Sequence, residues 1–236
     1  MTYLVTDLMY NHWYRRSRMH EQITNHPIAQ PAHQPHQNMI NLVLLGPPGA
    51  GKGVQSQKLI EKHQLVHITP GELLREQVKK NTTLGQQVAK YINAGQLAPS
   101  ALVTDIVATQ LAAKKDGPGF LFDGFPRTTA QAVALEALLS THDLQIDAVI
   151  LLEVPEAELL QRIKSRAQIA GRTDDQDEAK VTTRMRIYHE ETLPLADYYA
   201  QQNKLFKVDG VGEKDTVFER IVAVMAQQQL DVALPQ

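Results

Sequence analysis

Short runs of consecutive apolar residues recur along the chain, separated by longer segments with a helical spacing of apolar positions. Runs of this kind are typical of strands that are buried on both faces. Five of them predict strands, at 39–46, 65–69, 119–125, 147–154 and 205–210. The intervening segments predict helices at about 51–63, 71–80, 83–93, 99–115, 128–141 and 213–229. Strands that alternate with helices predict an α/β fold, in which a five-stranded parallel sheet is flanked by helices.

The composition narrows the class of protein. The 236 residues are enough for one α/β core, and no repeat or linker divides the expected domain, 39–232. A formal net charge of −2 argues against a general nucleic-acid binder. No apolar run is long enough to span a membrane, so we expect a cytoplasmic protein without a membrane partner. The chain has no cysteine, which excludes disulfides, thiol catalysis and Cys-ligated zinc.

Residues 1–38 have a different composition from the rest of the chain. They contain five of the nine histidines, together with the Pro- and Gln-rich stretch "NHPIAQPAHQPHQ", and they lack a continuous apolar segment typical of a secretory signal. We interpret them as a disordered extension, or as sequence upstream of a native start at Met39. The alternative is a metal-binding or docking tail, which the irregular spacing of the histidines does not favour.

The first motif with a chemical meaning follows the first predicted strand. Residues 46–53, "GPPGAGKG", match the phosphate-binding P-loop pattern G-x-x-x-x-G-K-[ST] except at the last position, Gly53. Backbone N–H groups of Gly49, Gly51, Lys52 and Gly53 are expected to form an anion cradle at a helix N-terminus. Lys52 would neutralise the β- and γ-phosphates. The alternative is a Gly-rich turn with a chance lysine, and the strand and helix on either side argue against it.

The second motif is "DGFPRT" at 123–128, which directly follows a predicted strand. Ligand groups in α/β proteins lie at the carboxyl ends of strands. Asp123 is suited to a hydrated Mg²⁺, and the Arg127 guanidinium can bind a phosphate through two hydrogen bonds. Taken alone, the motif is equally compatible with an ordinary turn that exposes its charges.

A group of arginines forms the third feature. Arg162 and Arg166 are four residues apart and therefore share a helix face, Arg172 lies in a Gly-containing loop, and Arg184 is in the next helix. Each could be a solvated surface residue. As a set beside a P-loop, they indicate a clamp for phosphates.

These motifs and their order resemble the adenylate kinase family in its short-lid form. The resemblance extends over about 39–229 and rests on "GPPGAGKG", "TPGELLRE", "GQLAPS", "GFLFDGFPRTTAQA" and "GRTDD…YHEETLPLADYY". It implies a P-loop NTPase-type core sheet with two inserts: a helical NMP-binding segment at 69–98 and a short lid at 166–175. The implied reaction is the reversible, Mg²⁺-dependent transfer of the terminal phosphoryl of ATP to AMP, giving two ADP, by a monomer.

The resemblance also assigns roles to individual residues. Those implied to stabilise the transferring phosphoryl are Lys52, Arg127, Arg162, Arg166, Arg172 and Arg184. Those implied to bind ATP are Gly49, Ala50, Gly51, Lys52, Gly53, Val54, Arg162 and Val211. Those implied to bind AMP are Pro70, Arg75, Ile92, Ala98, Gly124, Arg127, Gln131, Arg172 and Arg184. Glycine after the P-loop lysine is usual in this family, so Mg²⁺ is expected on the nucleotide phosphates and waters, with Asp123 holding it through water. No zinc is expected, since the lid is short and the chain lacks cysteine.

The chain departs from the family pattern at four places. Pro70 and Glu72 replace a usual threonine and aspartate, and Val54 replaces a usual threonine. The segment from Asp175 to Arg184 is one residue longer than usual, which would turn the rest of a continuous helix by roughly 100°. "TPGE" at 69–72 predicts a capping box, with Thr69 at the N-cap and Pro70 at the first helical position.

Two other functions fit parts of the pattern. The nearer alternative is a UMP/CMP-type nucleoside monophosphate kinase. Gln131 argues against it, because its amide suits the N1/N6 edge of adenine and uridylate enzymes generally carry asparagine there. The second alternative is a non-catalytic nucleotide-binding protein. The complete set of phosphate-binding cations argues against this class.

Overall fold

A computed structural model describes residues 39–113, 117–170 and 173–230, without the side chains of 169–174. All of these residues belong to one compact unit, Gln37–Gln236. The extension 1–38 and Arg172 lie outside the described residues, so the expectations for them stay predictions. No helix in the described ranges has the length and apolar character needed to cross a membrane.

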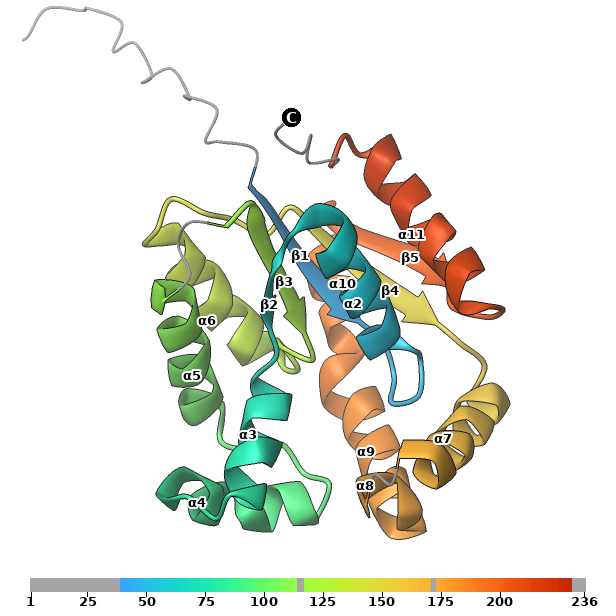
Figure 1. Ribbon diagram of the computed structural model, residues 1–236. Coiled ribbons are helices and arrows are strands. Elements are labelled where there is room, and N and C mark those ends of the chain that lie inside the picture. Colours follow the sequence, from blue (N-terminus) through green and yellow to red (C-terminus); the bar gives the residue numbers. More distant parts are fainter. Residues whose placement is uncertain (1–38, 114–116, 171–172, 231–236) are drawn as a thin grey trace, which may run out of the picture. The chain divides into compact units, whose positions relative to one another are not determined.

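Strands and helices alternate as the sequence predicts (Figure 1). In chain order the elements are β1 (Ile40–Leu45), α2 (Lys52–His63), β2 (Val66–Ile68), α3 (Pro70–Lys79), α4 (Thr83–Asn93), α5 (Ser100–Ala113), β3 (Gly119–Asp123), α6 (Thr129–Ser140), β4 (Ala148–Glu153), α7 (Glu156–Ala170), α8 (Thr173–Gln176), α9 (Glu178–Ile187), the π-helix η1 (Tyr188–Thr192), α10 (Pro194–Ala200), β5 (Leu205–Asp209) and α11 (Lys214–Gln227). Each predicted strand and helix is confirmed, with ends within about two residues of the expected ones, which is the usual uncertainty of helix ends.

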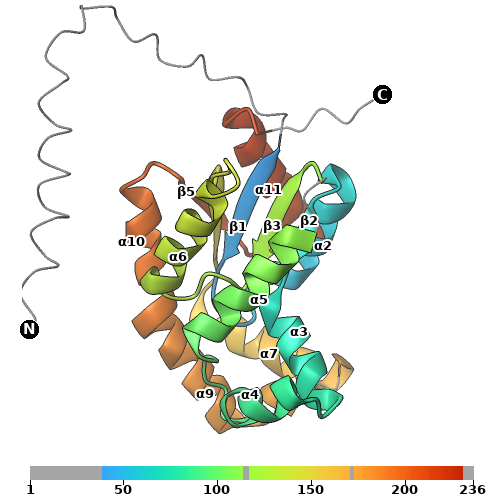
Figure 2. The ribbon, with the colours of Figure 1, turned by 90° about the vertical axis from the view of Figure 1, so that its left-hand side faces the viewer.

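The five strands form one parallel sheet in the order β2-β3-β1-β4-β5. Apolar side chains of β1 alternate between its two faces. Val43 and Leu45 belong to a core under α5, α6 and α10, whereas Leu42 and Leu44 belong to a second core under α2 and α11. Figures 1 and 2 show the sheet between these two groups of helices. The predicted fold class is therefore confirmed.

The strand order predicts a binding site at the carboxyl ends of the central strands. β1 lies in the middle, between β3 and β4, and the chain reverses its direction of winding there. In open parallel sheets, ligands bind outside the carboxyl ends of the strands at such a reversal. Figure 1 shows α3 and α4 beyond these carboxyl ends on one side, and α7, α8 and α9 on the other. The implied NMP-binding segment, 69–98, contains α3 and α4, and the implied lid, 166–175, runs from the end of α7 into α8.

Two local features differ from, or clarify, the sequence expectations. Thr69 is the N-cap of α3 and Pro70 begins the helix, but the Thr69 side chain makes no capping hydrogen bond, so the predicted capping box is wrong. A break separates α8 from α9, within the segment from Asp175 to Arg184 that we expect to be one residue longer than usual. Asp177 occupies the break and caps α9, accepting from the N–H groups of Ala179 and Lys180.

Candidate active site

The P-loop connects β1 to α2 and has the backbone shape of an anion cradle. Gly49 and Gly51 have φ of 89° and 91°, a left-handed region that favours glycine. A Cβ on Gly49 would also lie 3.0 Å from a side-chain carbon of Ile163 in α7. Gly51 is the N-cap of α2, so the N–H groups that follow it are at a helix N-terminus. Ala50 is buried beneath the loop, and Val54 is exposed on α2.

Lys52, the first residue of α2, is partly exposed, and its ammonium group lies against backbone carbonyls. Its Nζ donates to the carbonyl oxygens of Gly46 (2.7 Å) and Pro47 (3.0 Å). Burial lowers the pKa of Lys52 to about 8. Asp123 opposes this shift, while the positive charges of Arg127, Arg184 and Arg166 add to it. A cation held among other cations is a favourable site for a polyphosphate.

Asp123 ends β3 and lies beside the P-loop helix. Its Oδ2 accepts from Ser56 Oγ at 2.8 Å and lies 3.7 Å from His67 Nε2. Burial pushes the pKa of Asp123 upward, but contacts with His67, Lys52 and Ser56 outweigh burial and hold the pKa below its usual range. The carboxylate is therefore ionised at neutral pH. Neither Ser56 nor His67 was expected from the sequence, because neither belongs to a motif.

A hollow lies between the α3–α4 segment and the sheet, and we call it the α3–α4 hollow. Eight of the nine residues implied to bind AMP line it, namely Pro70, Arg75, Ile92, Ala98, Gly124, Arg127, Gln131 and Arg184. A Cβ placed on Gly71 would lie 3.5 Å from Arg75 Nη1 and 3.8 Å from Arg127 Nη2. The two guanidiniums are thus near each other at one end of the hollow, where they can bind one phosphate.

A second hollow, the P-loop hollow, adjoins the first, and five residues line both: Gly95, Leu97, Gly124, Arg127 and Arg184. Lys52, Gly46 and Pro48 line its other side. The wall is completed by Ile187, Tyr188 and Thr192, at and after the junction of α9 with the π-helix η1. Thr192 Oγ1 donates to the Arg127 carbonyl at 3.0 Å. The sequence pattern missed these three residues; π-helical turns are frequent at functional sites but have no sequence signature of their own.

Arg127 is fixed where the two hollows meet. Its Nε donates to the Gly124 carbonyl at 2.8 Å, across a loop with a cis peptide bond between Phe125 and Pro126. Gly124 has φ of 72°, and a Cβ there would lie 3.1 Å from Arg127 Nη2. Glycine at this position lets the guanidinium lie flat against the loop.

Arg166 and Arg184 are joined through one buried carboxylate. Asp175 Oδ2 accepts from Arg166 Nε at 2.5 Å, and Oδ1 accepts from Arg166 Nη2 (2.9 Å) and Arg184 Nη1 (2.7 Å). Burial raises the pKa of Asp175, but the bonds from both arginines outweigh it and hold the pKa below its usual range. Arg184, which follows the break at Asp177, thus lies at the site.

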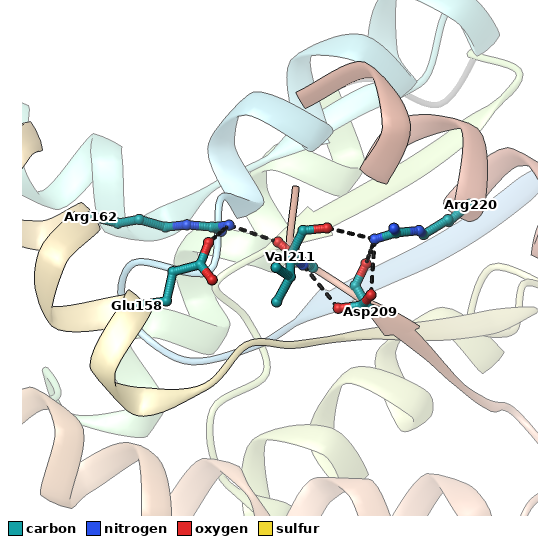
Figure 3. A network of polar contacts seen from close by, with 6 residues as sticks. Glu158, Arg162, Asp209, Val211 and Arg220 are labelled. Carbon is teal, nitrogen blue, oxygen red and sulfur yellow. Dashed lines mark hydrogen bonds and ion pairs between the residues drawn. The ribbon is translucent and has the colours of Figure 1, made fainter. Parts of the chain in front are cut away.

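Arg162 lies in α7, before Arg166, and contacts the loop after β5 (Figure 3). Its Nη2 donates to Glu158 and to the Gly210 carbonyl, the latter at 3.0 Å. The Val211 N–H donates to Asp209 Oδ1, and its carbonyl accepts from Arg220 Nη1 at 2.6 Å. The structure thus places Arg162 next to the Gly210–Val211 loop, which includes the other residue implied to bind ATP, and away from the two hollows.

The fold and site together define a P-loop phosphotransferase, in which a phosphate cradle and a second hollow meet at shared arginines. The family model described as Adenylate kinase matches residues 44–204. The chain is 42% identical to adenylate kinases of Phocaeicola vulgatus and Flavobacterium johnsoniae, each over 187 residues that make up 79% of this chain and 98% of the relative. It is also 42% identical to that of Bacteroides thetaiotaomicron over 183 residues, 78% of this chain and 96% of the relative. The chain belongs to the adenylate kinase family.

Proposed function

We propose that the enzyme catalyses ATP + AMP ⇌ 2 ADP, with ATP on the P-loop and AMP in the α3–α4 hollow. One observation carries the proposal: Arg127 and Arg184 line both hollows, and Lys52 faces them from the P-loop. Cations at the junction are where the phosphoryl group would pass between two nucleotides. UMP/CMP kinase activity is not favoured, and the non-catalytic alternative is not supported by the family assignment.

The residues act by binding and orienting charged groups. P-loop N–H groups and Lys52 hold the ATP phosphates, while Arg75 and Arg127 hold the AMP phosphate in line with the γ-phosphoryl. Arg127, Arg184 and Arg166 stabilise the charge on the equatorial oxygens of the transition state. Asp175 holds Arg166 and Arg184 together for this role. A strong general base is unnecessary, because the attacking phosphate is already anionic. We assign Arg162 and Val211 to ATP binding, and the stabilisation of the transferring phosphoryl by Arg162 and Arg172 stays a prediction.

The residues present fit a magnesium ion that is held mainly by the nucleotide. Among the described residues, no group of three or more His, Cys, Asp or Glu side chains could bind a metal ion without further ligands. Ser56 and His67 both contact Oδ2 of Asp123, which leaves Oδ1 to accept from a metal-bound water. When bound with ATP, Mg²⁺ would neutralise charge on the β- and γ-phosphates.

Closure of the site should matter, because an open site would transfer the phosphoryl to water. We propose that the NMP-binding segment 69–98 and the lid 166–175 supply this closure. We also expect the enzyme to be a cytoplasmic monomer, which light scattering on the purified protein tests for the oligomeric state.

The test of the proposed reaction is a coupled assay that pairs ATP with AMP, UMP, CMP and GMP in turn. We expect Mg²⁺-dependent formation of ADP, with AMP preferred over UMP or CMP by at least tenfold, because Gln131 offers a donor and an acceptor in the hollow. Equal or faster turnover with CMP would contradict the assignment. Omission of the acceptor nucleotide is the control for hydrolysis of ATP, and omission of Mg²⁺ tests the metal dependence.

A further inference from the structure

Gln131, in the first turn of α6, has both ends of its side-chain amide held by the protein. Its Oε1 accepts from the Arg127 N–H at 2.8 Å, and its Nε2 donates to Ser100 Oγ at 3.1 Å. The residue is only 3% exposed, yet it lines the α3–α4 hollow. A primary amide has two lone pairs and two protons. One lone pair and one proton therefore remain for a ligand in the hollow.

The contact with the Arg127 N–H fixes which end of the amide is oxygen. A backbone N–H can only donate, so Arg127 requires the oxygen on its side. Adenine presents a donor at N6 beside an acceptor at N1, whereas a 6-oxopurine presents an acceptor at O6 beside a donor at N1. An amide held in one orientation can pair with only one of these two orders. To pair with the other order, the amide would have to turn over and set its NH₂ group against the Arg127 N–H, which costs a hydrogen bond.

Ser100 supplies the second contact from a different element. It is the first residue of α5, it is exposed, and it lies 31 residues before Gln131 in the sequence. We propose that Ser100 is a positioning residue for acceptor specificity: it anchors the nitrogen end of Gln131 in the orientation that the Arg127 N–H sets, so that the amide selects adenine over 6-oxopurines. This inference rests on the proposed function, in which Gln131 contacts the base of AMP.

The test compares Ser100→Ala with the parent enzyme. We expect the KM for AMP to rise about two- to twelvefold, the range for one neutral hydrogen bond. Turnover at saturating AMP and the KM for ATP should stay within twofold, and the preference for AMP over IMP should fall. Ser100→Thr keeps the hydroxyl and should behave as the parent. Ser140→Ala makes the same change at the exposed last residue of α6 and should alter nothing.

A double-mutant cycle with Gln131→Ala separates positioning from a structural role. If Ser100 acts through Gln131, Ser100→Ala has no further effect on the KM for AMP in the Gln131→Ala background. An equal effect in both backgrounds, or no effect of Ser100→Ala in the parent, would overturn the inference while the proposed reaction stands. If Gln131→Ala leaves the AMP/IMP preference unchanged, the assignment of Gln131 fails, and the role of Ser100 fails with it.

A third variant keeps the proposal testable if Gln131→Ala does not fold. Ser100→Asp replaces the hydroxyl by a group that only accepts, so it should hold Nε2 at least as firmly. A carboxylate at the first position of a helix is also favourable. We expect an AMP/IMP preference equal to or above that of the parent. A preference as low as that of Ser100→Ala would overturn the proposal.

Discussion

At the scale of single residues, Pro70 lines the α3–α4 hollow beside Arg75 and Gln131. The family usually has threonine there, and proline lacks the hydroxyl. Pro70→Thr should therefore add one hydrogen bond near AMP, worth about 0.5–1.5 kcal/mol. The KM for AMP should fall roughly two- to twelvefold. The KM for ATP should not move. Saturation curves for both nucleotides test this prediction.

The matched control for this change is Pro194→Thr, since Pro194 also begins a helix, α10, and is exposed. It should leave both Michaelis constants unchanged. If the AMP curve of Pro70→Thr does not shift, or the ATP curve shifts equally, Pro70 does not face bound AMP.

Lys52 leads to a prediction about pH. Its pKa in the free protein is lowered to about 8 by burial, and bound phosphates should raise it again because they favour the charged form. Above pH 8, ATP binding should therefore take up a proton, and affinity should fall as the pH rises. Calorimetry at pH 8.5 in two buffers with different ionisation enthalpies measures this uptake.

Two variants check the origin of the proton. Lys52→Met should bind ATP more weakly and take up no proton at pH 8.5. Lys58→Met, on the same helix but paired with Asp215, should retain the uptake. Uptake that persists in Lys52→Met would assign the proton to another group.

Sequence motifs predicted the residues that line the site better than the contacts that hold them. The positions of Arg75, Gln131 and Arg184 follow from short motifs, and the structure brings them together. The partners of Asp123, by contrast, come from separate elements: Ser56 from α2 and His67 from β2. Such pairs depend on how helices pack on the sheet, which local patterns do not specify.

At the scale of elements, the pattern of apolar positions predicted the sheet and its helices, because β1, β3 and β4 each contain a continuous apolar run. It did not predict the role of the polar residue in β1. Asn41 is 2% exposed; its Nδ2 donates to the Gln145 carbonyl, and its Oδ1 accepts from the Phe120 N–H. The break at Asp177 was also not predicted, because residues 175–184 contain no glycine or proline that would mark the end of a helix.

The junction of α7, α8 and α9 depends on Asp175, whose side chain is fully buried between two arginines. Asp175→Asn keeps the shape but removes the charge and offers one oxygen in place of two. Hydrogen bonds to charged groups contribute about 1.5–3 kcal/mol each. We expect a melting temperature lower by several degrees, at roughly 2–4 °C per kcal/mol, and a loss of turnover because Arg166 and Arg184 lose their alignment.

Asp177→Asn is the control for this junction, because asparagine caps a helix as well as aspartate does. It should change neither the melting temperature nor the turnover by a measurable amount. If both variants behave alike, the buried contacts of Asp175 do not determine the alignment of the arginines.

At the scale of the whole molecule, the described residues from Met39 onward form a paired sheet with a hydrophobic core on each face. Each of the five strands is paired, and helices cover both faces of the sheet. The sequence of 1–38 lacks the apolar periodicity needed to add to this core. We therefore expect a protein that starts at Met39 to keep its kcat/KM for AMP within twofold and its melting temperature within a few degrees of the full chain.

A protein that starts at Leu44 is the control, because it loses the part of β1 that pairs with both β3 and β4 and should not fold cooperatively. Circular dichroism melts and the coupled assay on the three proteins measure both quantities. A clear drop in melting temperature for the protein that starts at Met39 would show that residues 1–38 pack on the enzyme.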